Sequence, residues 1–466
     1  MKKELKLLSF FSSLLLTFNL MWNTMKKFIL ILLFSLFSFN AQSLSIISDE
    51  ETETFLEDVL TPIFKEANLP LSREKIHIVK DNSLNAFVGN QNHMFVHTGT
   101  LINASTSNEI EGVLAHETGH ILGGHLLRLK IKLQDIEKAS LASLIAAAGA
   151  AAVSGRGDAA IAVVLGTQSS AINSMTNYQI TEERAADETA VSLLSNQKKS
   201  IQGLKDFMEK IKSANRLEGI KENTYFRTHP LTQERITFFN EKISNLPSFS
   251  SSEELDDRLK RIQAKLYAYI FPLNKVLRKY PLTDISIEAR IAHTIYYMRQ
   301  KNINRVSQYI DPLITEEPLN PYFWELKAQA LLESNNIKDA VIAYKQALDL
   351  KPSSDLFKIN YAQAKLASSP SKKAQQELIP LLEQANRNNN TPEAFHFLGQ
   401  IYSNLGEHGI SNYYLAEYNH ATGNDSYALK MVSKALHKPL RTDIQLRALD
   451  LKERLKEKTS PKKTLL

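Results

Sequence analysis

Two histidines and a glutamate within residues 116–120, which read HETGH, have the types and spacing that metal chemistry needs. In a helix, residues four apart differ by about 40° around the axis, so the imidazoles of His116 and His120 project from one face and can bind one metal ion. Glu117 lies one position further and faces the open coordination position of that ion. The spacing therefore predicts a metal site with a general base beside it. Two solvated histidines and a surface glutamate are the structural alternative.

A catalytic zinc ion usually has three protein ligands and one water, so a third ligand must come from another element. The best candidate is Glu183 in residues 181–187, TEERAAD, which we expect to begin a helix with Thr181 as its N-cap. Glu183 and Asp187 are four apart, so one can bind metal while the other accepts a hydrogen bond from a ligand histidine. Glu182 is the rival ligand, and an ordinary acidic helix start is the alternative.

A third candidate segment is residues 228–235, THPLTQER. His229 precedes a proline, so we expect it on an extended turn, with Arg235 on the helix that follows. His229 could stabilise a developing oxyanion, or occupy the open metal position when substrate is absent. A capping or packing histidine is the alternative.

These segments need elements that position them. We expect short strands at residues 76–79 and 94–97, a turn between them at residues 85–87, and a long helix over residues 108–129 that carries HETGH. A substrate peptide could then pair along the edge of the 94–97 strand.

The stretch from residue 140 to residue 167 is apolar and rich in alanine and glycine. Each of its halves is too short to cross a bilayer. The stretch could form a helical hairpin over the active site or make a peripheral membrane contact; a buried helix pair is the alternative.

From about residue 255 the pattern is helix after helix, and it repeats. Aromatic, small and large residues recur at the tetratricopeptide spacing and end in a proline, at Trp324, Ala328, Leu331, Ala340, Tyr344, Ala347 and Pro352. A looser copy lies in residues 412–435, and a degenerate one in residues 287–318. A generic helical bundle is the alternative.

The chain has 466 residues and no cysteine, which excludes thiolate zinc sites, disulfides and cysteine nucleophiles. Of its formal net charge of +6, residues 1–43 carry +4, which leaves only +2 for the remainder and does not indicate a nucleic-acid partner. Residues 25–43 read as a secretory signal peptide, with a basic start, an apolar run and small residues at the end. An uncleaved membrane anchor is the alternative.

The order HETGH, then EERAAD about 60 residues later, then RTHPLTQER resembles the HtpX/BepA-like zinc metallopeptidases. The BepA-like branch adds C-terminal tetratricopeptide repeats. The resemblance implies His116, His120 and Glu183 as ligands of one Zn²⁺ per chain and Glu117 as general base. It also implies that Asp187 supports a ligand and that His229 and Arg235 reach the site.

The resemblance implies a mainly α fold: a gluzincin-type α+β metalloprotease domain with a small sheet, then an all-α tetratricopeptide-repeat solenoid. We divide the chain into a signal peptide (1–43, with an upstream extension 1–24), a protease domain (44–247), a linker (248–255), repeats (256–457) and a basic tail (458–466).

By resemblance, the protein is a zinc metalloendopeptidase in the periplasm of a Gram-negative bacterium. Its substrates would be unfolded or misassembled polypeptides, and its partner the outer-membrane β-barrel assembly machinery, reached through the repeats. The alternatives are a periplasmic chaperone or assembly factor whose zinc site is kept latent by His229, and a scaffold with a vestigial HETGH.

Overall fold

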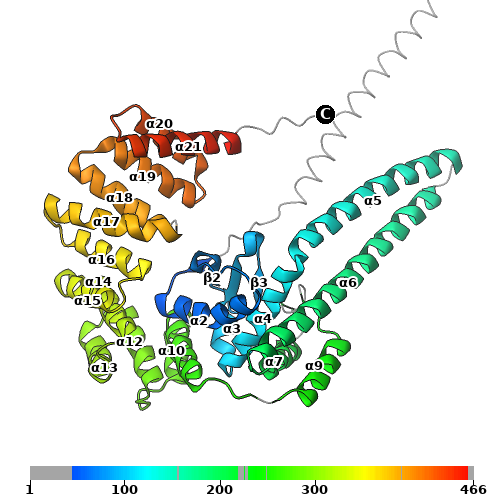
Figure 1. Ribbon diagram of the computed structural model, residues 1–466, viewed down its shortest axis with the longest axis horizontal. Coiled ribbons are helices and arrows are strands. Elements are labelled where there is room, and N and C mark those ends of the chain that lie inside the picture. The colour runs from blue at the N-terminus through cyan, green and yellow to red at the C-terminus, as the bar shows by residue number, and fades with distance from the viewer. Residues whose placement is uncertain are drawn as a thin grey trace, which may run out of the picture. The chain divides into compact units, whose positions relative to one another are not determined.

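The structure is a computed structural model that describes residues 45–154, 157–218, 225, 229–247, 249–389 and 391–459 (Figure 1). The predicted signal peptide and most of the predicted basic tail lie outside the described residues. Residues 46–466 form one compact unit. None of the helices among the described residues is long and apolar enough to span a bilayer.

A four-stranded sheet with the order β1-β2-β4-β3 lies near the start of this unit. Its strands are β1 (Ile46–Ile47), β2 (Ile76–Val79), β3 (Ala86–Val88) and β4 (Met94–His97). β2 and β4 are parallel, and β3 pairs antiparallel with β4, with Phe87 opposite Phe95. Two expectations from the sequence are therefore wrong. The turn predicted at residues 85–87 falls on strand β3, and β4 is an inner strand, so the edge strands are β1 and β3, of which β3 lies beside α4.

Alternation along the strands explains how the sheet packs. Ile76, Ile78, Met94 and Val96 are buried on one face, in a core shared with helices α2 (Glu50–Glu66) and α4 (Ser107–Gly123). Side chains two apart in a strand share a face, so these β-branched and apolar residues form one continuous apolar layer. The sheet thereby fixes β3 beside the helix that carries HETGH.

Helix α4 ends earlier than the sequence predicts. Gly124 adopts a left-handed conformation, with φ of +63°, and its backbone N–H bonds to the carbonyls of His120 and Ile121. A residue with a side chain rarely adopts this φ, so glycine terminates the helix here. The predicted helix over residues 108–129 is therefore two helices, α4 and α5 (His125–Ser154), joined at Gly124.

The apolar stretch of residues 140–167 falls on a long helical hairpin made by α5 and α6 (Gly157–Asn196). The two helices pack on each other along the hairpin (Figure 1). Thr181 lies inside α6, where its hydroxyl donates to the carbonyl of Asn177. The predicted helix start at Thr181 is therefore wrong, because the apolar residues before it continue the same helix.

The remaining helices of this region are α3 (Thr98–Asn103), α7 (Gln202–Glu218) and α9 (Gln233–Asn245). Helix α4 packs against both α6 and α7. Close approach depends on glycine: a Cβ on Gly119 would lie 2.7 Å from the carbonyl oxygen of Ala186, and one on Gly112 would lie 2.6 Å from the backbone nitrogen of Leu204.

The C-terminal region is a succession of helices in which each packs on the next. They are α10 (Glu253–Ile270), α11 (Leu273–Lys279), α12 (Ile287–Arg299), α13 (Ile303–Glu316), α14 (Pro321–Glu333), α15 (Ile337–Leu350), α16 (Asp355–Ala367), α17 (Lys372–Asn389), α18 (Pro392–Leu405), α19 (His408–Ala421), α20 (Asp425–Leu436) and α21 (Thr442–Thr459). The repeat spacing predicted from the sequence falls on α14 and α15. There Ala328, Ala340 and Ala347 are fully buried where the two helices cross.

Helix α10 belongs to two cores. Its residues Leu259, Ile262 and Leu266 pack into the core of the sheet and α4. Its residues Ala264 and Ala268 pack into the core of α12, α13 and α14.

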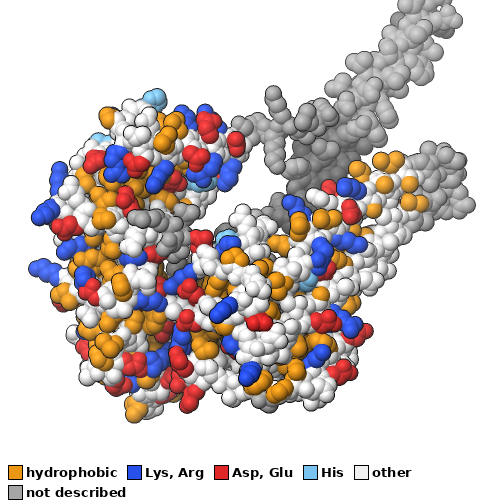
Figure 2. Space-filling model, in the orientation of Figure 1, with side chains coloured by type: hydrophobic (Ala, Val, Ile, Leu, Met, Phe, Trp, Pro, Cys, Tyr) orange, Lys and Arg blue, Asp and Glu red, His pale blue; other side chains and the backbone are white. Residues whose placement is uncertain are grey.

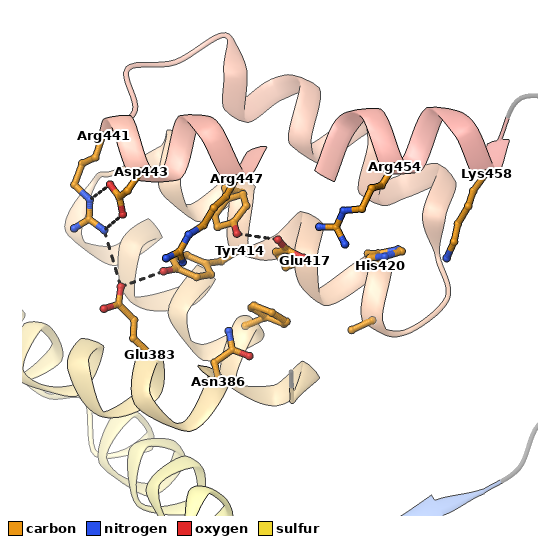
Figure 3. A pocket seen from close by; sticks show the side chains of 13 residues that line it. Glu383, Asn386, Tyr414, Glu417, His420, Arg441, Asp443, Arg447, Arg454 and Lys458 are labelled. Carbon is orange, nitrogen blue, oxygen red and sulfur yellow. Dashed lines mark hydrogen bonds and ion pairs between the residues drawn. The ribbon is translucent and has the colours of Figure 1, made fainter. Parts of the chain in front are cut away.

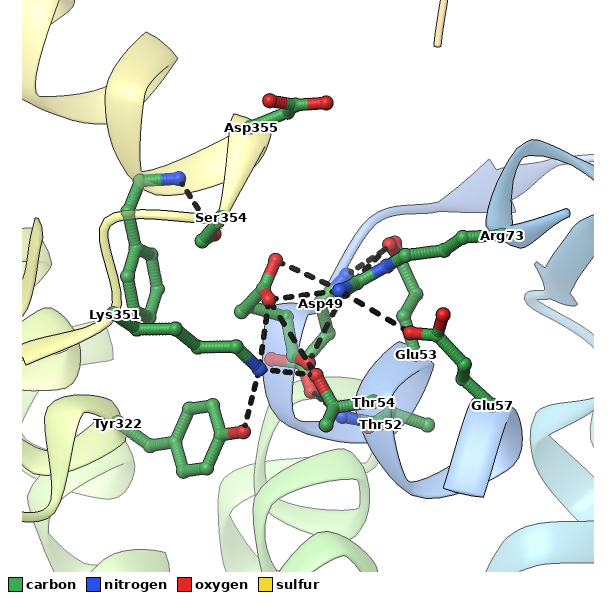
Figure 4. Close-up of polar contacts among 12 residues, drawn as sticks. Asp49, Thr52, Glu53, Thr54, Glu57, Arg73, Tyr322, Lys351, Ser354 and Asp355 are labelled. Carbon is green, nitrogen blue, oxygen red and sulfur yellow. Dashed lines mark hydrogen bonds and ion pairs between the residues drawn. The ribbon is translucent and has the colours of Figure 1, made fainter. Parts of the chain in front are cut away.

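Charged residues also join the repeats to α2. The Lys265 ammonium is buried 2.7 Å from Asp49 Oδ2 and 3.1 Å from Glu51 Oε2. Lys351 lies 3.0 Å from Glu50 Oε1, and Figure 4 shows its side chain between Tyr322 and the start of α2. An unpaired charge is costly when it is buried, so separating these ion pairs would be unfavourable. Their pairing therefore holds α2 and the repeats together.

Candidate metal centre

Helix α4 brings the two histidines of HETGH together as predicted. His116 Nε2 lies 3.1 Å from His120 Nε2. His116 is fully buried, whereas the side chain of His120 retains 13% of its exposure. The two Nε2 atoms face one another, so both can donate a lone pair to the same cation.

Helix α6 contributes the predicted carboxylates from the same face. Glu183 Oε2 lies 3.2 Å from His116 Nε2, and Glu183 Oε1 lies 3.3 Å from His120 Nε2. Asp187 Oδ1 lies 2.9 Å from the other ring nitrogen of His116, Nδ1. An acceptor at Nδ1 favours the tautomer that leaves Nε2 free for a metal.

Glu182, the rival ligand, lies outside this cluster. Its carboxylate is 2.6 Å from His125 Nε2 and pairs with the Arg128 guanidinium. His125 Nδ1 in turn lies 2.6 Å from His120 Nδ1. Glu182 therefore contacts the second histidine of HETGH only through His125, and sequence reasoning missed this chain of contacts. The available signals were the histidine five residues after His120 and the adjacent pair of glutamates.

His229 and Arg235 both reach the site. His229 Nδ1 lies 2.9 Å from Glu183 Oε1 and 3.4 Å from His116 Nε2, and its ring stacks on Tyr225. Arg235, on α9, is buried; its Nε lies 2.6 Å from Asp187 Oδ2 and its Nη1 lies 2.9 Å from Glu183 Oε2. Thr228, the residue before His229, is outside the described residues.

The donor atoms are spaced as zinc ligands are. Tetrahedral ligands with bonds of about 2.0–2.1 Å stand about 3.3 Å apart. The two Nε2 atoms of His116 and His120 are 3.1 Å apart, and they lie 3.2 and 3.3 Å from Glu183 Oε2 and Oε1 respectively, so each histidine faces one oxygen of the same carboxylate. The ligand atoms of these three residues and His229 all lie within 4.8 Å of one another. Two imidazoles and one carboxylate are a donor set that zinc commonly takes, so the residues fit this metal.

Burial and charge set the protonation of the cluster. Burial lowers the pKa of His116, but hydrogen bonds with Asp187 and Glu183 outweigh it and raise that pKa to about 10. Burial lowers the pKa of His120 to about 3. Burial raises the pKa of Glu183, but the neighbouring His229 and His116 outweigh it and hold that pKa well below its ordinary value. Glu183 therefore stays negatively charged among the histidines, as a carboxylate ligand must be.

Glu117 has a different environment. It is buried, and burial raises the pKa of its carboxyl. Its Oε1 lies 3.5 Å from His229 Nε2, and the backbone of Val88 on β3 hydrogen-bonds to the carboxyl. Glu117 thus stands between the ligand cluster and the free edge of the sheet.

A cleft of about 510 Å³ opens onto these residues. One wall is formed by β3 and the residues after it, from Phe87 to Asn92, and another by the start of α5, including Leu126 and Leu127. Glu117, His120 and His229 lie at its base. The cleft is therefore bounded by a free strand edge on one side and apolar side chains on the other.

A second and larger cavity, about 960 Å³, lies among the last repeat helices (Figure 3). Basic side chains line it from α21 and the residue before that helix: Arg441, Arg447, Arg454 and Lys458. Opposite them, Tyr414 donates to Glu383 and Tyr413 donates to Glu417. This cavity offers both charges and aromatic rings, but its described residues include no cluster suited to metal.

Residues 50–243 match the model of peptidase family M48, and residues 321–354 match that of the tetratricopeptide repeat. The chain thus has an M48 peptidase domain followed by a tetratricopeptide-repeat region, and the resemblance drawn from HETGH, EERAAD and RTHPLTQER is confirmed. The predicted fold class is confirmed as well: a mainly helical chain with a small sheet, followed by a helical solenoid.

The chain is 23% identical over 285 residues to a putative beta-barrel assembly-enhancing protease of Vibrio cholerae, which covers 60% of this chain and 58% of the relative. It is 19% identical over 331 residues to the beta-barrel assembly-enhancing protease of Escherichia coli, over 70% of this chain and 67% of the relative. It is 31% identical over 172 residues to the Escherichia coli metalloprotease YcaL, over 37% of this chain and 62% of the relative. The match thus spans less than two thirds of the Vibrio cholerae and YcaL proteins.

Proposed function

We propose that this protein is a zinc-dependent metalloendopeptidase that hydrolyses misfolded or stalled envelope proteins during outer-membrane protein assembly. The observation that carries the proposal is the convergence of His116, His120 and Glu183, at separations of 3.1 to 3.3 Å, beside the buried Glu117. A bound Zn²⁺ would polarise the scissile carbonyl and lower the pKa of a water toward about 7.

The chain's own residues then have distinct tasks. Glu117 accepts the proton of the attacking water at its carboxylate and delivers it to the leaving amine; burial raises the pKa of this carboxyl, which makes it a stronger base than an exposed glutamate. Asp187 holds Nδ1 of His116, and Arg235 holds Asp187 and Glu183. His229 faces Glu117 from across the cleft base and can donate to a developing oxyanion.

Substrate binding is assigned to the free edge of β3. This strand pairs on one side only, and it lines the cleft next to Glu117. An extended peptide that adds to this edge is held by backbone hydrogen bonds, which need no particular sequence. Such binding selects for unfolded chains, since folded substrates offer no free extended segment.

We assign partner recognition to the repeats. Tetratricopeptide helices stack into a surface that recognises other proteins. The relatives named for β-barrel assembly lead us to propose the β-barrel assembly machinery as partner, and the periplasm as location. The cavity among α17, α19 and α21, with its basic and aromatic lining, is the candidate docking site.

The test combines metal analysis with proteolysis. The purified chain from residue 44 should hold one zinc, and it should cleave unfolded casein. Glu117→Gln should keep the zinc and lose at least a hundredfold in kcat, because the general base alone is removed. His116→Ala should lose the zinc. Wild-type protein without casein cleavage, or Glu117→Gln with full activity, contradicts the proposal.

A latent zinc site is the second candidate, and the position of His229 favours it. His229 Nδ1 lies 3.4 Å from His116 Nε2, among the ligand atoms rather than away from them. If His229 caps the metal, the protein acts mainly as a chaperone or assembly factor, and His229→Ala should raise casein cleavage. If His229 stabilises the oxyanion, the same variant should lower it.

A further inference from the structure

The hairpin of α5 and α6 has a surface that nothing in the peptidase site uses. We call residues 125–154 and 157–181 the α5–α6 arm. Helix α5 packs on α6 and, at its beginning, on α4. At 1.5 Å per residue, the 30 residues of α5 extend about 45 Å. Among the described residues, most of the arm is therefore packed only on its own two helices (Figure 1).

The far half of the arm is apolar and almost without charge. Between Lys138 and Glu182 the charged residues are Arg156 and Asp158 alone. Leu144 and Ile145 are 56% and 68% exposed on α5, and Leu165 and Ile172 are 57% and 59% exposed on α6. Figure 2 shows hydrophobic side chains gathered over this part of the arm. These four exposed leucine and isoleucine side chains on one arm indicate a surface that a membrane or another molecule covers.

The positions of these exposed side chains on both helices favour a bilayer over a single protein partner. Leu144 and Ile145 are consecutive, so they point about 100° apart around α5. Leu165 and Ile172 lie on the other helix of the hairpin. The interfacial region of a bilayer surrounds whatever enters it, so it can cover exposed side chains on both helices at once.

The near half of the arm carries the charges that a membrane surface would select. Arg128, Lys130, Lys132 and Lys138 lie there against Asp135 and Glu137. Arg128 pairs with Glu182, and Lys138 with Asp135 at 3.8 Å. An apolar end followed by a net basic segment is the pattern of helices that bind anionic membrane surfaces.

We propose that the α5–α6 arm seats the enzyme on an anionic bilayer, with its far half among the lipid headgroups and acyl-chain ends and its lysines at the surface. The cleft begins at Leu126 and Leu127, at the base of the arm. Membrane seating would therefore hold the cleft close to polypeptides at the bilayer surface. The seating needs no peptidase activity, so Glu117→Gln should bind vesicles as the wild type does.

Flotation with lipid vesicles tests the proposal. The protein used begins at residue 44, because the apolar N-terminal segments would bind lipid by themselves and residues 46–466 form a compact unit. We expect binding to vesicles that contain phosphatidylglycerol. The double variant Leu144→Glu, Ile145→Glu should lose at least tenfold in binding. Ile285→Glu, which changes an 83% exposed residue outside the arm, should change it less than twofold.

Two measurements keep the outcome interpretable. Unchanged cleavage of a short soluble peptide and an unchanged Tm would show that the double variant is folded, since neither residue lines the cleft. Lys132→Gln with Lys138→Gln should reduce binding to anionic vesicles and leave the weaker binding to phosphatidylcholine vesicles unchanged.

Three results would overturn the proposal: no vesicle binding by the wild type, equal binding by the double variant, or equal wild-type binding to anionic and neutral vesicles. A double variant that binds vesicles normally but no longer binds unfolded casein would assign the arm to substrate instead. A double variant that abolishes a wild-type dimer, with no vesicle binding by either protein, would assign it to self-association.

Discussion

Replacing Asp187 with asparagine separates the ion-pair network from the metal ligands themselves. Asp187 Oδ1 is 2.9 Å from His116 Nδ1, and Arg235 contacts both of its oxygens at 2.6 and 2.9 Å. Asparagine has the same size but no charge, and one of its two polar atoms is a donor that faces other donors. His116 Nδ1 thereby keeps at most a neutral acceptor in place of a carboxylate, and we expect Nε2 to be a weaker ligand as a result.

The expected loss of zinc affinity follows from comparable supporting carboxylates. Their removal typically costs 10- to 100-fold in metal affinity, which corresponds to about 1.4 to 2.7 kcal/mol. Without metal, the variant also leaves the buried Arg235 with Glu183 as its remaining carboxylate partner, and we expect about 3 kcal/mol of lost stability. Arginine buried beside Asp187 outweighs desolvation and lowers the pKa of that carboxyl, so the stabilisation is present at neutral pH and is lost as pH falls through the acid range.

Competition with a chromophoric zinc chelator would measure the dissociation constant, and urea unfolding of the metal-free protein would measure stability. Glu188→Gln is the matched control: it changes the next residue on α6, whose carboxylate is exposed and pairs only with Arg184 among the described residues. A zinc Kd for Asp187→Asn within twofold of wild type, in a folded protein, would refute the role assigned to Asp187.

Three further predictions concern packing, pH and metal. Gly119→Ala should lower the free energy of unfolding by about 1–3 kcal/mol and weaken zinc binding, because the new methyl group would lie 2.7 Å from the carbonyl oxygen of Ala186 and push α4 away from α6. Urea unfolding measures the stability and chelator competition measures the zinc affinity. Wild-type values in both would contradict the packing argument. Burial raises the pKa of Glu325 to about 7, so the folded protein binds a proton there between about pH 4.5 and 7, and stability falls as pH rises through this window. Glu325→Gln should therefore be more stable than wild type at pH 8 by about 1–3 kcal/mol and nearly equal at pH 4.5 in urea titrations, and a constant difference would argue against the assigned pKa. Removal of zinc by a chelator should lower the Tm reversibly, since a ligand at 1,000 times its Kd stabilises by about 4 kcal/mol, whereas an unchanged Tm would mean that no metal had been bound.

Local spacing made much of the site predictable. His116 and His120 share a turn of helix, and Glu183 and Asp187 share another, so each pair has its geometry fixed by one helix. The contact between α4 and α6 depends on the tertiary structure. The sequence signals for it were Gly119 on α4 and the resemblance of the three motifs to a known peptidase family. The roles of these residues remain predictions.

Strand order was not predictable in the same way. Residues 76–79 and 94–97 have the apolar alternation of strands, but alternation does not say which strand lies at an edge. The sequence predicts a turn at residues 85–87, which begin with an asparagine, whereas Ala86–Val88 form a strand. Pairing with β4 overrides that local preference, and so the free edge lies elsewhere than expected.

The helix break at Gly124 and the continuous α6 were missed for opposite reasons. Apolar periodicity continues across Gly124, so nothing but the glycine itself marked an end. Thr181 has the chemistry of an N-cap, yet the uncharged residues before it form helix as part of a hairpin. Packing along the whole of α6 outweighs the N-cap preference of Thr181.

Because α10 supplies Leu259, Ile262 and Leu266 to the core beneath α4, that core extends beyond the segment that matches the peptidase family. A ribosome making this chain must pass residue 270 before that core can close, well beyond the end of the family match at residue 243. Helix α4, which carries HETGH, is thus fully packed only after the first helix that leads into the repeats has been synthesised, so the candidate metal centre completes its surroundings when the repeat region has begun to form.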